Sequence, residues 1–96
     1  PAEEIFDFLP KIIIADSALD GICHGANLMK PSILEIDSEI QKNDLVLIKT
    51  QKGEAVAIAK AESSIEDIVR KEKGICATLE KVIMKKDTYP SFWKKT

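Results

Sequence analysis

The sequence predicts one small domain of mainly β structure with small helices, an α+β barrel of five to six short strands. The chain has 96 residues, of which 45% are hydrophobic, enough for one core and too few for two. Its apolar residues fall in short β-branched runs separated by turn residues, which is typical of short strands. Two segments with helix-capping residues and glycine stops interrupt these runs. We therefore expect residues 1–96 to form a single domain.

The first strand is predicted at Lys11 to Ala15, a β-branched run of sequence KIIIA. Ahead of it, the proline-closed segment 1–10 indicates a short helical lead-in. Asp16 and Ser17 are N-cap candidates for a helix that extends to about Cys23 and stops at the following glycine.

The segment 26–32 is expected to be a turn with two apolar anchors, Leu28 and Met29, because Pro31 prevents a long helix. A short strand is then predicted at residues 33–36.

The clearest hairpin joins the apolar runs 45–49 and 55–61 across a turn at Lys52-Gly53. The second run alternates alanines with larger residues, as expected for a strand in a tight barrel interior.

Ser63 and Ser64 are candidate caps for a second helix, which Gly74 would stop. Its apolar stripe is Ile65, Ile68 and Val69. A last strand is predicted from 75 to 84.

The charge distribution is uneven although the net charge is only −2. Nine basic and fifteen acidic residues precede Lys81, giving −6, whereas five lysines and Asp87 follow from there, giving +4. A clustered basic surface is what a phosphate backbone requires, but a solvated lysine-rich terminus gives the same pattern. In the tail 85–96, Tyr89, Phe92 and Trp93 could stack on unpaired bases or pin the chain end to the barrel.

The sequence contains few residues or motifs that indicate an enzyme. Cys23 and His24 are adjacent, and adjacent helical residues do not face each other, so they make a poor nucleophile and base pair. The two cysteines are expected to be free and buried, with no metal site. Phosphate-cradling and hydrolase motifs are absent from the sequence, so no catalytic residue and no cofactor is predicted. No apolar run approaches the roughly 20 residues that a membrane span requires, and the N-terminus lacks the pattern of a secretory signal, which predicts an intracellular protein.

The segment from His24 to Ser32 combines a glycine, an amide and a proline in a stretch too broken for regular structure. Such backbone is expected to expose N–H groups and to permit close approach of a ligand at Gly25 and Ala26. Asn27 can offer a donor and an acceptor to a base edge, and Lys30 can reach a phosphate. An ordinary helix-to-strand turn, with Gly25 as its C-cap, remains the alternative.

Several stretches occur together in a specific order. They are Asp16-Ser17-Ala18, Ile22 to Ala26, Leu28 with Pro31, Lys52 to Ala55, Lys73-Gly74-Ile75, Lys81-Val82 with Met84, and Asp87 with Tyr89-Pro90 and Trp93. In this order the chain resembles the PUA domain of dyskerin and its archaeal counterparts, the catalytic proteins of H/ACA RNA-guided pseudouridine synthases. The resemblance covers essentially the whole chain, departing from the usual glycine at Ser32 and the usual acid at Asn27.

The resemblance implies a PUA-type pseudo-barrel whose role is to hold the ACA motif and lower stem of a guide RNA. It implies as partners the rest of the synthase and its ribonucleoprotein subunits, with no membrane and no small-molecule substrate. The catalytic aspartate of the family belongs to a separate domain that this chain does not show, so the chain is not expected to be an enzyme by itself. Because it begins at Pro1 without an initiator Met, it is expected to be an excised fragment. Removal of the initiator Met before a proline is the alternative explanation of this N-terminus. The location would be cytoplasmic in an archaeon and nucleolar in a eukaryote.

The candidate RNA-binding residues divide into two groups. Base contacts are expected from the turn residues Gly25, Ala26 and Asn27, with Pro31 beside them. Phosphate contacts are expected from four lysines, chosen by their charge and placement: Lys30, Lys60, Lys85 and Lys86. Two alternatives remain, a PUA domain of another RNA-modifying or translation protein and a structural or protein-interaction barrel without an RNA surface.

Overall fold

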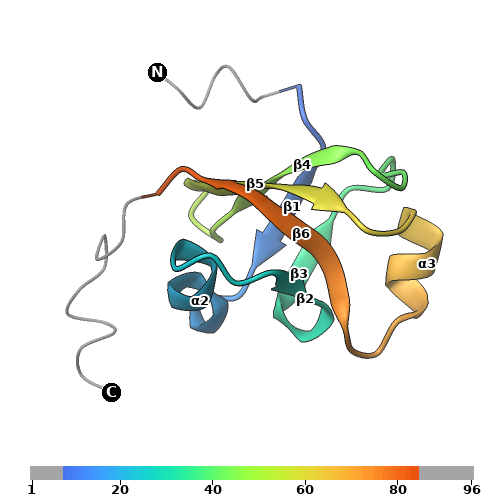
Figure 1. Ribbon diagram of the computed structural model, residues 1–96, viewed down its shortest axis with the longest axis horizontal. Coiled ribbons are helices and arrows are strands. Elements are labelled where there is room, and N and C mark those ends of the chain that lie inside the picture. The colour runs from blue at the N-terminus through green and yellow to red at the C-terminus, as the bar shows by residue number, and fades with distance from the viewer. Residues whose placement is uncertain (1–7, 85–96) are drawn as a thin grey trace.

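The computed structural model describes residues 8–84 and shows one six-stranded sheet that curves into a nearly closed barrel (Figure 1). The strand order in the sheet is β2-β6-β5-β4-β1-β3. All neighbouring strands are antiparallel except β1 and β4, which are parallel. The elements are β1 (Lys11–Ile14), a 3-10 turn (Asp16–Ala18), α2 (Leu19–Cys23), β2 (Leu28–Met29), a 3-10 turn (Lys30–Ser32), β3 (Ile33–Ile36), β4 (Leu45–Lys49), β5 (Ala55–Ala61), α3 (Ile65–Arg70) and β6 (Ile75–Val82).

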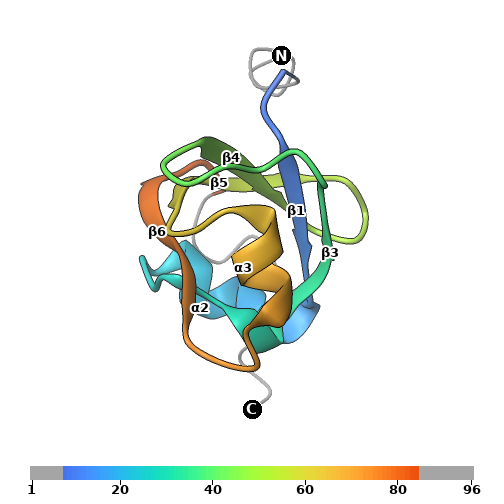
Figure 2. The ribbon, with the colours of Figure 1, turned by 90° about the vertical axis from the view of Figure 1, so that its right-hand side faces the viewer.

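Closure of the barrel depends on the turn Lys30–Ser32, because it joins the two edge strands of the sheet. β2 and β3 lie at opposite ends of the strand order yet are separated in the chain by these three residues. The Lys30 N–H donates to the Gly74 carbonyl at 2.9 Å, and the Ser32 carbonyl accepts the Ala15 N–H at 2.9 Å. Pro31 suits such a turn, since its fixed φ is already helical. The chain thus crosses from one edge to the other beneath α3 (Figure 2).

The side chain of Lys30 strengthens this crossing. Its ammonium donates to the carbonyl of Lys71 at 2.7 Å and lies 3.3 Å from the carbonyl of Val69, at the C-terminal end of α3. The last carbonyls of a helix lack intrahelical partners, and a cation there is favoured by the helix dipole. Lys30 therefore ties the closing turn to α3 across 39 to 41 positions of sequence.

The core fills the barrel interior with β-branched and small side chains. Fully buried side chains from β1, β4 and α3 meet around β5, where Ala57, Ala59 and Ala61 leave room for them. A second, smaller cluster of Leu9, Leu47, Ala55 and Ile58 packs on the other side of the sheet. β5 is thus covered on both faces, which explains why its apolar run is nearly continuous.

Most of the elements predicted from sequence are confirmed, and the hairpin most fully. Thr50 is buried in its turn, where its hydroxyl accepts the N–H groups of Lys52 and Glu54. Strands are confirmed at 11–14, 33–36, 45–49, 55–61 and, ending two residues early, 75–82.

The prediction that residues 26–32 are only a turn was wrong, because Leu28–Met29 pairs with β6 as β2. Leu28 is buried as predicted, but Met29 is 41% exposed, since successive residues of a strand point to opposite faces.

The predictions for the helix ends also need correction. Asp16 and Ser17 lie in a 3-10 turn, and the cap residue of α2 is Ala18, without a side-chain bond. α3 ends at Arg70, four residues before the predicted glycine stop. In this short helix Ile68 faces the core, whereas Val69, rotated by about 100°, is 60% exposed. Among the described residues no helix is long and apolar enough to cross a membrane.

We predict that Lys30→Met lowers the free energy of unfolding by about 1–3 kcal/mol, because partly buried carbonyls lose a charged donor while the alkyl chain is kept. Urea titration measures the change. Lys42→Met, at an exposed lysine between β3 and β4, is the matched control and should stay within about 0.5 kcal/mol of the parent. Equal stability of the two variants would contradict the role given to Lys30.

Candidate functional site

The turn that follows α2 is a Schellman motif built on Gly25. Gly25 has φ of +98°, its N–H donates to Ile22 O at 3.0 Å, and the N–H of Ala26 donates to Gly21 O at 2.9 Å. These bonds satisfy carbonyls that the helix end would leave free. The expectation that this turn exposes its N–H groups is therefore wrong at both residues, because both amides serve the helix.

Asn27 fastens the same turn to β6. Its Oδ1 accepts the backbone N–H of Leu79 at 3.0 Å, next to the point where β2 pairs with β6 through Leu28 and Ala77. The Asn27 side chain therefore adds one more hydrogen bond beside the backbone hydrogen bonds that join β2 to β6.

A shallow hollow of about 210 Å³ lies between this turn and β6, lined by Gly25, Leu79, Glu80, Lys81 and Val82. A Cβ added to Gly25 would meet nothing within 4 Å, so the turn presents open space there. Gly25 forms one rim of the hollow. The turn 24–27 to which it belongs is exposed, and its carbonyl oxygens keep acceptor capacity because each has two lone pairs.

An irregularity in β6 shapes the other rim. Leu79 pairs with Ala59 and Lys81 pairs with Ile58, so Glu80 is an extra residue on β6. A bulge of this kind changes the direction of neighbouring side chains, and both Glu80 and Lys81 are exposed. Sequence reasoning missed Lys81 as a site residue, although the change of charge sign along the chain begins at that lysine.

The other predicted site residues lie apart from the hollow. Lys30 is bonded to the end of α3, and Pro31 is exposed in the closing turn. Lys60 is exposed on β5, in register with Leu45 and Thr78. None of these three lines the hollow. Lys85 and Lys86, like the tail aromatics, lie outside the described residues. Of the predicted set, the structure brings Gly25, Ala26 and Asn27 together.

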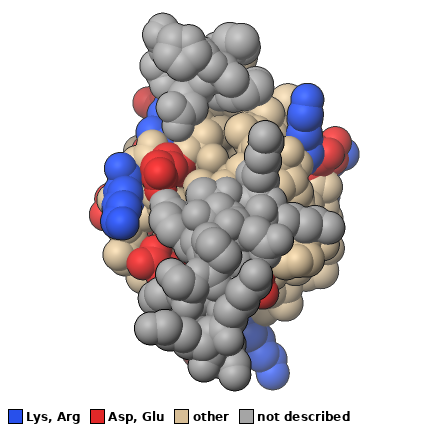
Figure 3. Space-filling view, turned by 90° about the vertical axis from the view of Figure 1, so that its left-hand side faces the viewer, with Lys and Arg blue, Asp and Glu red and all other residues tan. Residues whose placement is uncertain are grey.

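Charge on this side of the molecule is mixed. α2 and the end of β6 lie on the left in Figure 1, and Figure 3 shows that side with basic and acidic side chains interspersed around its rim. The lining of the hollow is mixed as well, since an anion there meets Lys81 beside Glu80.

The side chains of Cys23 and His24 lie in different surroundings, one buried and the other exposed, as expected for adjacent residues at a helix end. Cys23 is buried, and burial raises the pKa of its thiol, with a further contribution from the Asp20 charge. His24 is exposed, and its Nδ1 lies 2.8 Å from the Asp20 carbonyl oxygen and 3.2 Å from Asp20 Oδ1. A protonated, buried thiol is a poor nucleophile. Cys76 is also free and buried, and burial raises the pKa of its thiol.

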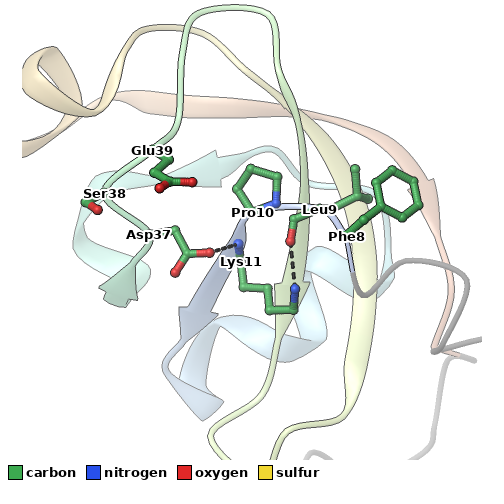
Figure 4. A pocket seen from close by; sticks show the side chains of 7 residues that line it. All are labelled: Phe8, Leu9, Pro10, Lys11, Asp37, Ser38 and Glu39. Atoms are coloured by element: carbon green, nitrogen blue, oxygen red, sulfur yellow. Dashed lines mark hydrogen bonds between the residues drawn. The ribbon is translucent and has the colours of Figure 1, made fainter.

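A larger hollow of about 390 Å³ lies at the other end of the barrel (Figure 4), between residues 8–11 and residues 37–39. Its carboxylates, Asp37 and Glu39, lie on the side of the β3–β4 connection, and Asp37 Oδ2 accepts the N–H of Lys11 at 2.7 Å. The ammonium of Lys11 donates to the Leu9 carbonyl at 2.7 Å. These carboxylates disfavour an anionic ligand, so the hollow at Gly25 is the better candidate for a phosphate-bearing one. No group of metal-binding side chains occurs within residues 8–84.

Comparison with known proteins identifies the domain type. The PUA domain model matches residues 10–83. Probable tRNA pseudouridine synthase B of Methanosarcina barkeri is 44% identical over 95 residues, and that of Pyrococcus abyssi is 45% identical over 93 residues. The aligned residues are 99% and 97% of this chain, yet the chain spans about 28% of the length of either relative.

Two solved structures have the same fold at similar identity. The chain superposes on the archaeal box H/ACA sRNP Nop10-Cbf5 complex with a TM-score of 0.89 and 45% identity, over 97% of this chain and 30% of that one. For an H/ACA RNP bound to a substrate RNA containing 2'-deoxyuridine, the TM-score is 0.90 and the identity 42%, over 97% and 29%.

We predict opposite effects for Gly25, in this turn, and Gly21, in α2. Gly25→Ala should lower the free energy of unfolding by about 1–2 kcal/mol, because its positive φ is strained for any other residue even in open space. Gly21→Ala should raise it by up to about 1 kcal/mol, because Gly21 is helical and an added Cβ would lie at an ordinary 3.8 Å from the Cβ of Ala26. Thermal or urea unfolding of both variants decides this, and a stabilising Gly25→Ala would contradict the turn geometry.

Proposed function

The chain belongs to the PUA domain family, and from this premise we propose that it anchors guide RNA for an H/ACA RNA-guided pseudouridine synthase. The observation that carries the proposal is the match over nearly the whole chain, at 42–45% identity, to structures of H/ACA ribonucleoproteins and to tRNA pseudouridine synthases. The chain corresponds to less than a third of those proteins. The proposal therefore assigns the isomerisation to the remainder of such a synthase and RNA anchoring to this domain.

The proposed RNA site is the hollow between the Gly25 turn and β6. A shallow, open depression with exposed backbone suits an unpaired base, since RNA is read mainly at single-stranded nucleotides. Gly25, Ala26 and Asn27 contact the bases in this proposal, and the lysines hold phosphates, which position the RNA without reading sequence. Lys81, in the hollow itself, joins Lys60, Lys85 and Lys86 in that role, while Lys30 and Pro31 act by keeping the barrel closed.

The proposed partners follow from the same relatives. The ligand is the ACA motif and adjoining lower stem of a guide RNA, and the protein partners are the rest of the synthase and its ribonucleoprotein subunits. Because the named relatives are archaeal, the proposed place of action is the cytoplasm.

Two alternatives have weaker support. PUA domains of other proteins have the same fold at lower similarity, for example a conserved PUA domain protein from Thermoplasma acidophilum, with a TM-score of 0.71 and 25% identity over 75% of the chain. A protein-interaction role is favoured only by the net charge of −2 and by the mixed charge of the hollow's lining, where Glu80 lies beside Lys81.

The deciding experiment is binding of the chain to an H/ACA hairpin with and without its ACA tail. We expect tighter binding to the tailed hairpin, by roughly 10-fold or more, because each specific base contact contributes about 1–3 kcal/mol. Fluorescence anisotropy measures both affinities, with a scrambled tail of equal length as control. Equal affinity for all three RNAs would refute ACA anchoring, and no RNA binding at all would favour the protein-interaction alternative.

A second prediction concerns Lys81. If its ammonium neutralises one phosphate, Lys81→Ala should weaken binding to tailed and untailed hairpins alike and reduce the salt dependence of log affinity by about 1. Affinities measured from low to moderate salt give the slopes. Lys42→Ala, at an exposed lysine outside the hollow, is the control and should leave the slope unchanged. A slope that is the same in both variants would remove Lys81 from the site.

A further inference from the structure

Three large aliphatic side chains are exposed where α3, β2 and β6 lie together. They are Val69 at the end of α3, Met29 at the end of β2 and Ile75 at the start of β6, which are 60%, 41% and 39% exposed. Met29 and Ile75 are cross-strand partners, so their side chains leave the same face of the sheet. Val69 adjoins them, because its carbonyl oxygen lies 3.3 Å from the ammonium of Lys30, the residue after Met29. The three make up an aliphatic patch at the end of the barrel where α3 lies (Figure 2).

Positive charge surrounds the aliphatic patch. The side chains of Arg70 and Lys73 are exposed, and neither forms an ion pair or hydrogen bond within residues 8–84. The ammonium groups of Lys30 and Lys71 also lie here, each donating to a backbone carbonyl at 2.7 Å. A carbonyl is neutral, so it leaves the charge of the ammonium uncompensated. Glu72 is the only acid between α3 and β6, and four cations against one carboxylate give this rim a net charge of +3.

We propose that the aliphatic patch and its basic rim dock an acidic segment of a protein partner, one that also carries aliphatic side chains. Exposed apolar surface within a polar rim is typical of protein–protein contacts. Carboxylates of the partner face Arg70 and Lys73, which favours encounter and fixes the orientation. Its aliphatic side chains cover the patch, and removal of that surface from water supplies the affinity.

RNA is a poorer match for this surface, although phosphates also suit a basic rim. Unpaired bases stack on aromatic side chains, and the patch is aliphatic. An RNA stem presents phosphates and riboses, which offer no apolar surface to cover these side chains. The patch is also separate from the RNA site proposed above, since none of its residues lines the hollow at Gly25. The chain can therefore hold RNA and a protein segment at the same time.

Titration of the isotope-labelled chain with a synthetic peptide, followed by NMR, tests this docking surface. The probe is a helical peptide of glutamates and leucines whose leucines share one face. We expect backbone amide shifts to change at residues 29–30 and 69–75 and to stay unchanged at residues 79–82. One control peptide has serine in place of leucine, the other lysine in place of glutamate, and each should bind about 10-fold more weakly or worse. No shift change at the patch, or equal binding of the probe and both controls, would overturn the proposal.

Variants of the chain test the rim and the patch separately. Arg70→Gln with Lys73→Gln removes two charges and leaves the carbonyl-bonded lysines in place, so it should weaken probe binding about 10-fold at low salt and less at high salt. Lys42→Gln with Lys52→Gln, at exposed lysines in the connections before and after β4, removes the same charge elsewhere and should change the affinity less than about 2-fold. Val69→Ser should also weaken binding, because apolar cover is lost. Equal affinities of the two double variants would contradict the docking role of the rim.

The same spectra distinguish the other possible occupants. An H/ACA hairpin that shifts residues 29–30 and 69–75, and that Arg70→Gln with Lys73→Gln weakens, would identify an RNA surface and overturn the proposal. Shifts at these residues that grow with protein concentration when no peptide is present would identify a second copy of the chain as the occupant, which also overturns it. Probe binding at the patch that persists with the hairpin bound supports the proposal. Probe binding without any RNA binding supports it equally, and in that case only the proposed RNA-anchoring function fails.

Discussion

Closure of the sheet by the three-residue turn Lys30–Ser32 is the constraint on which the rest of the structure depends. A sheet of six short strands has two edges, and each edge is a row of unpaired backbone groups. Here β2 and β3 are consecutive in the chain but lie at opposite ends of the strand order. The turn must therefore span the gap, and it is held there by backbone bonds to Ala15 and Gly74 and by the Lys30 ammonium on the end of α3.

The candidate site is built on the strand that this closure positions. β2 has only two residues, too few to form a stable pair alone, so its place beside β6 depends on what precedes and follows it. The closing turn follows it, and the Gly25 turn, with the Asn27 bond to Leu79, precedes it. The hollow is consequently bounded by the Gly25 turn and by β6. β2 pairs with β6 and directly follows the turn, so it fixes the spacing between them. The shape of the hollow is therefore determined by the fold itself.

Local patterns predicted the elements whose contacts are local in sequence. The hairpin of β4 and β5 follows from two apolar runs and a glycine turn, and the helix stop at Gly25 follows from glycine alone. The role of Lys30 could not be predicted, because its partners lie 39 to 41 residues away and its charge suggested a phosphate. β2 was missed because a strand of two residues shows no periodicity in the sequence. That the N–H groups of Gly25 and Ala26 bond to the last carbonyls of α2 depends on where the helix ends, which the sequence did not determine.

The near-neutral charge of the domain determines how specificity can arise. Phosphate contacts by a few lysines provide attraction that falls with salt and carries no sequence information, and Glu80 beside Lys81 weakens even that attraction in the hollow. Under the proposed function, discrimination between RNAs therefore rests on short-range groups held in one orientation. The turn meets this requirement, because every bond that fixes it also decides which atoms remain outward: the helix uses the amides of Gly25 and Ala26, and Leu79 engages the Asn27 oxygen. The hydrogen bonds that stabilise the turn thus also decide which of its groups are left for the proposed RNA ligand.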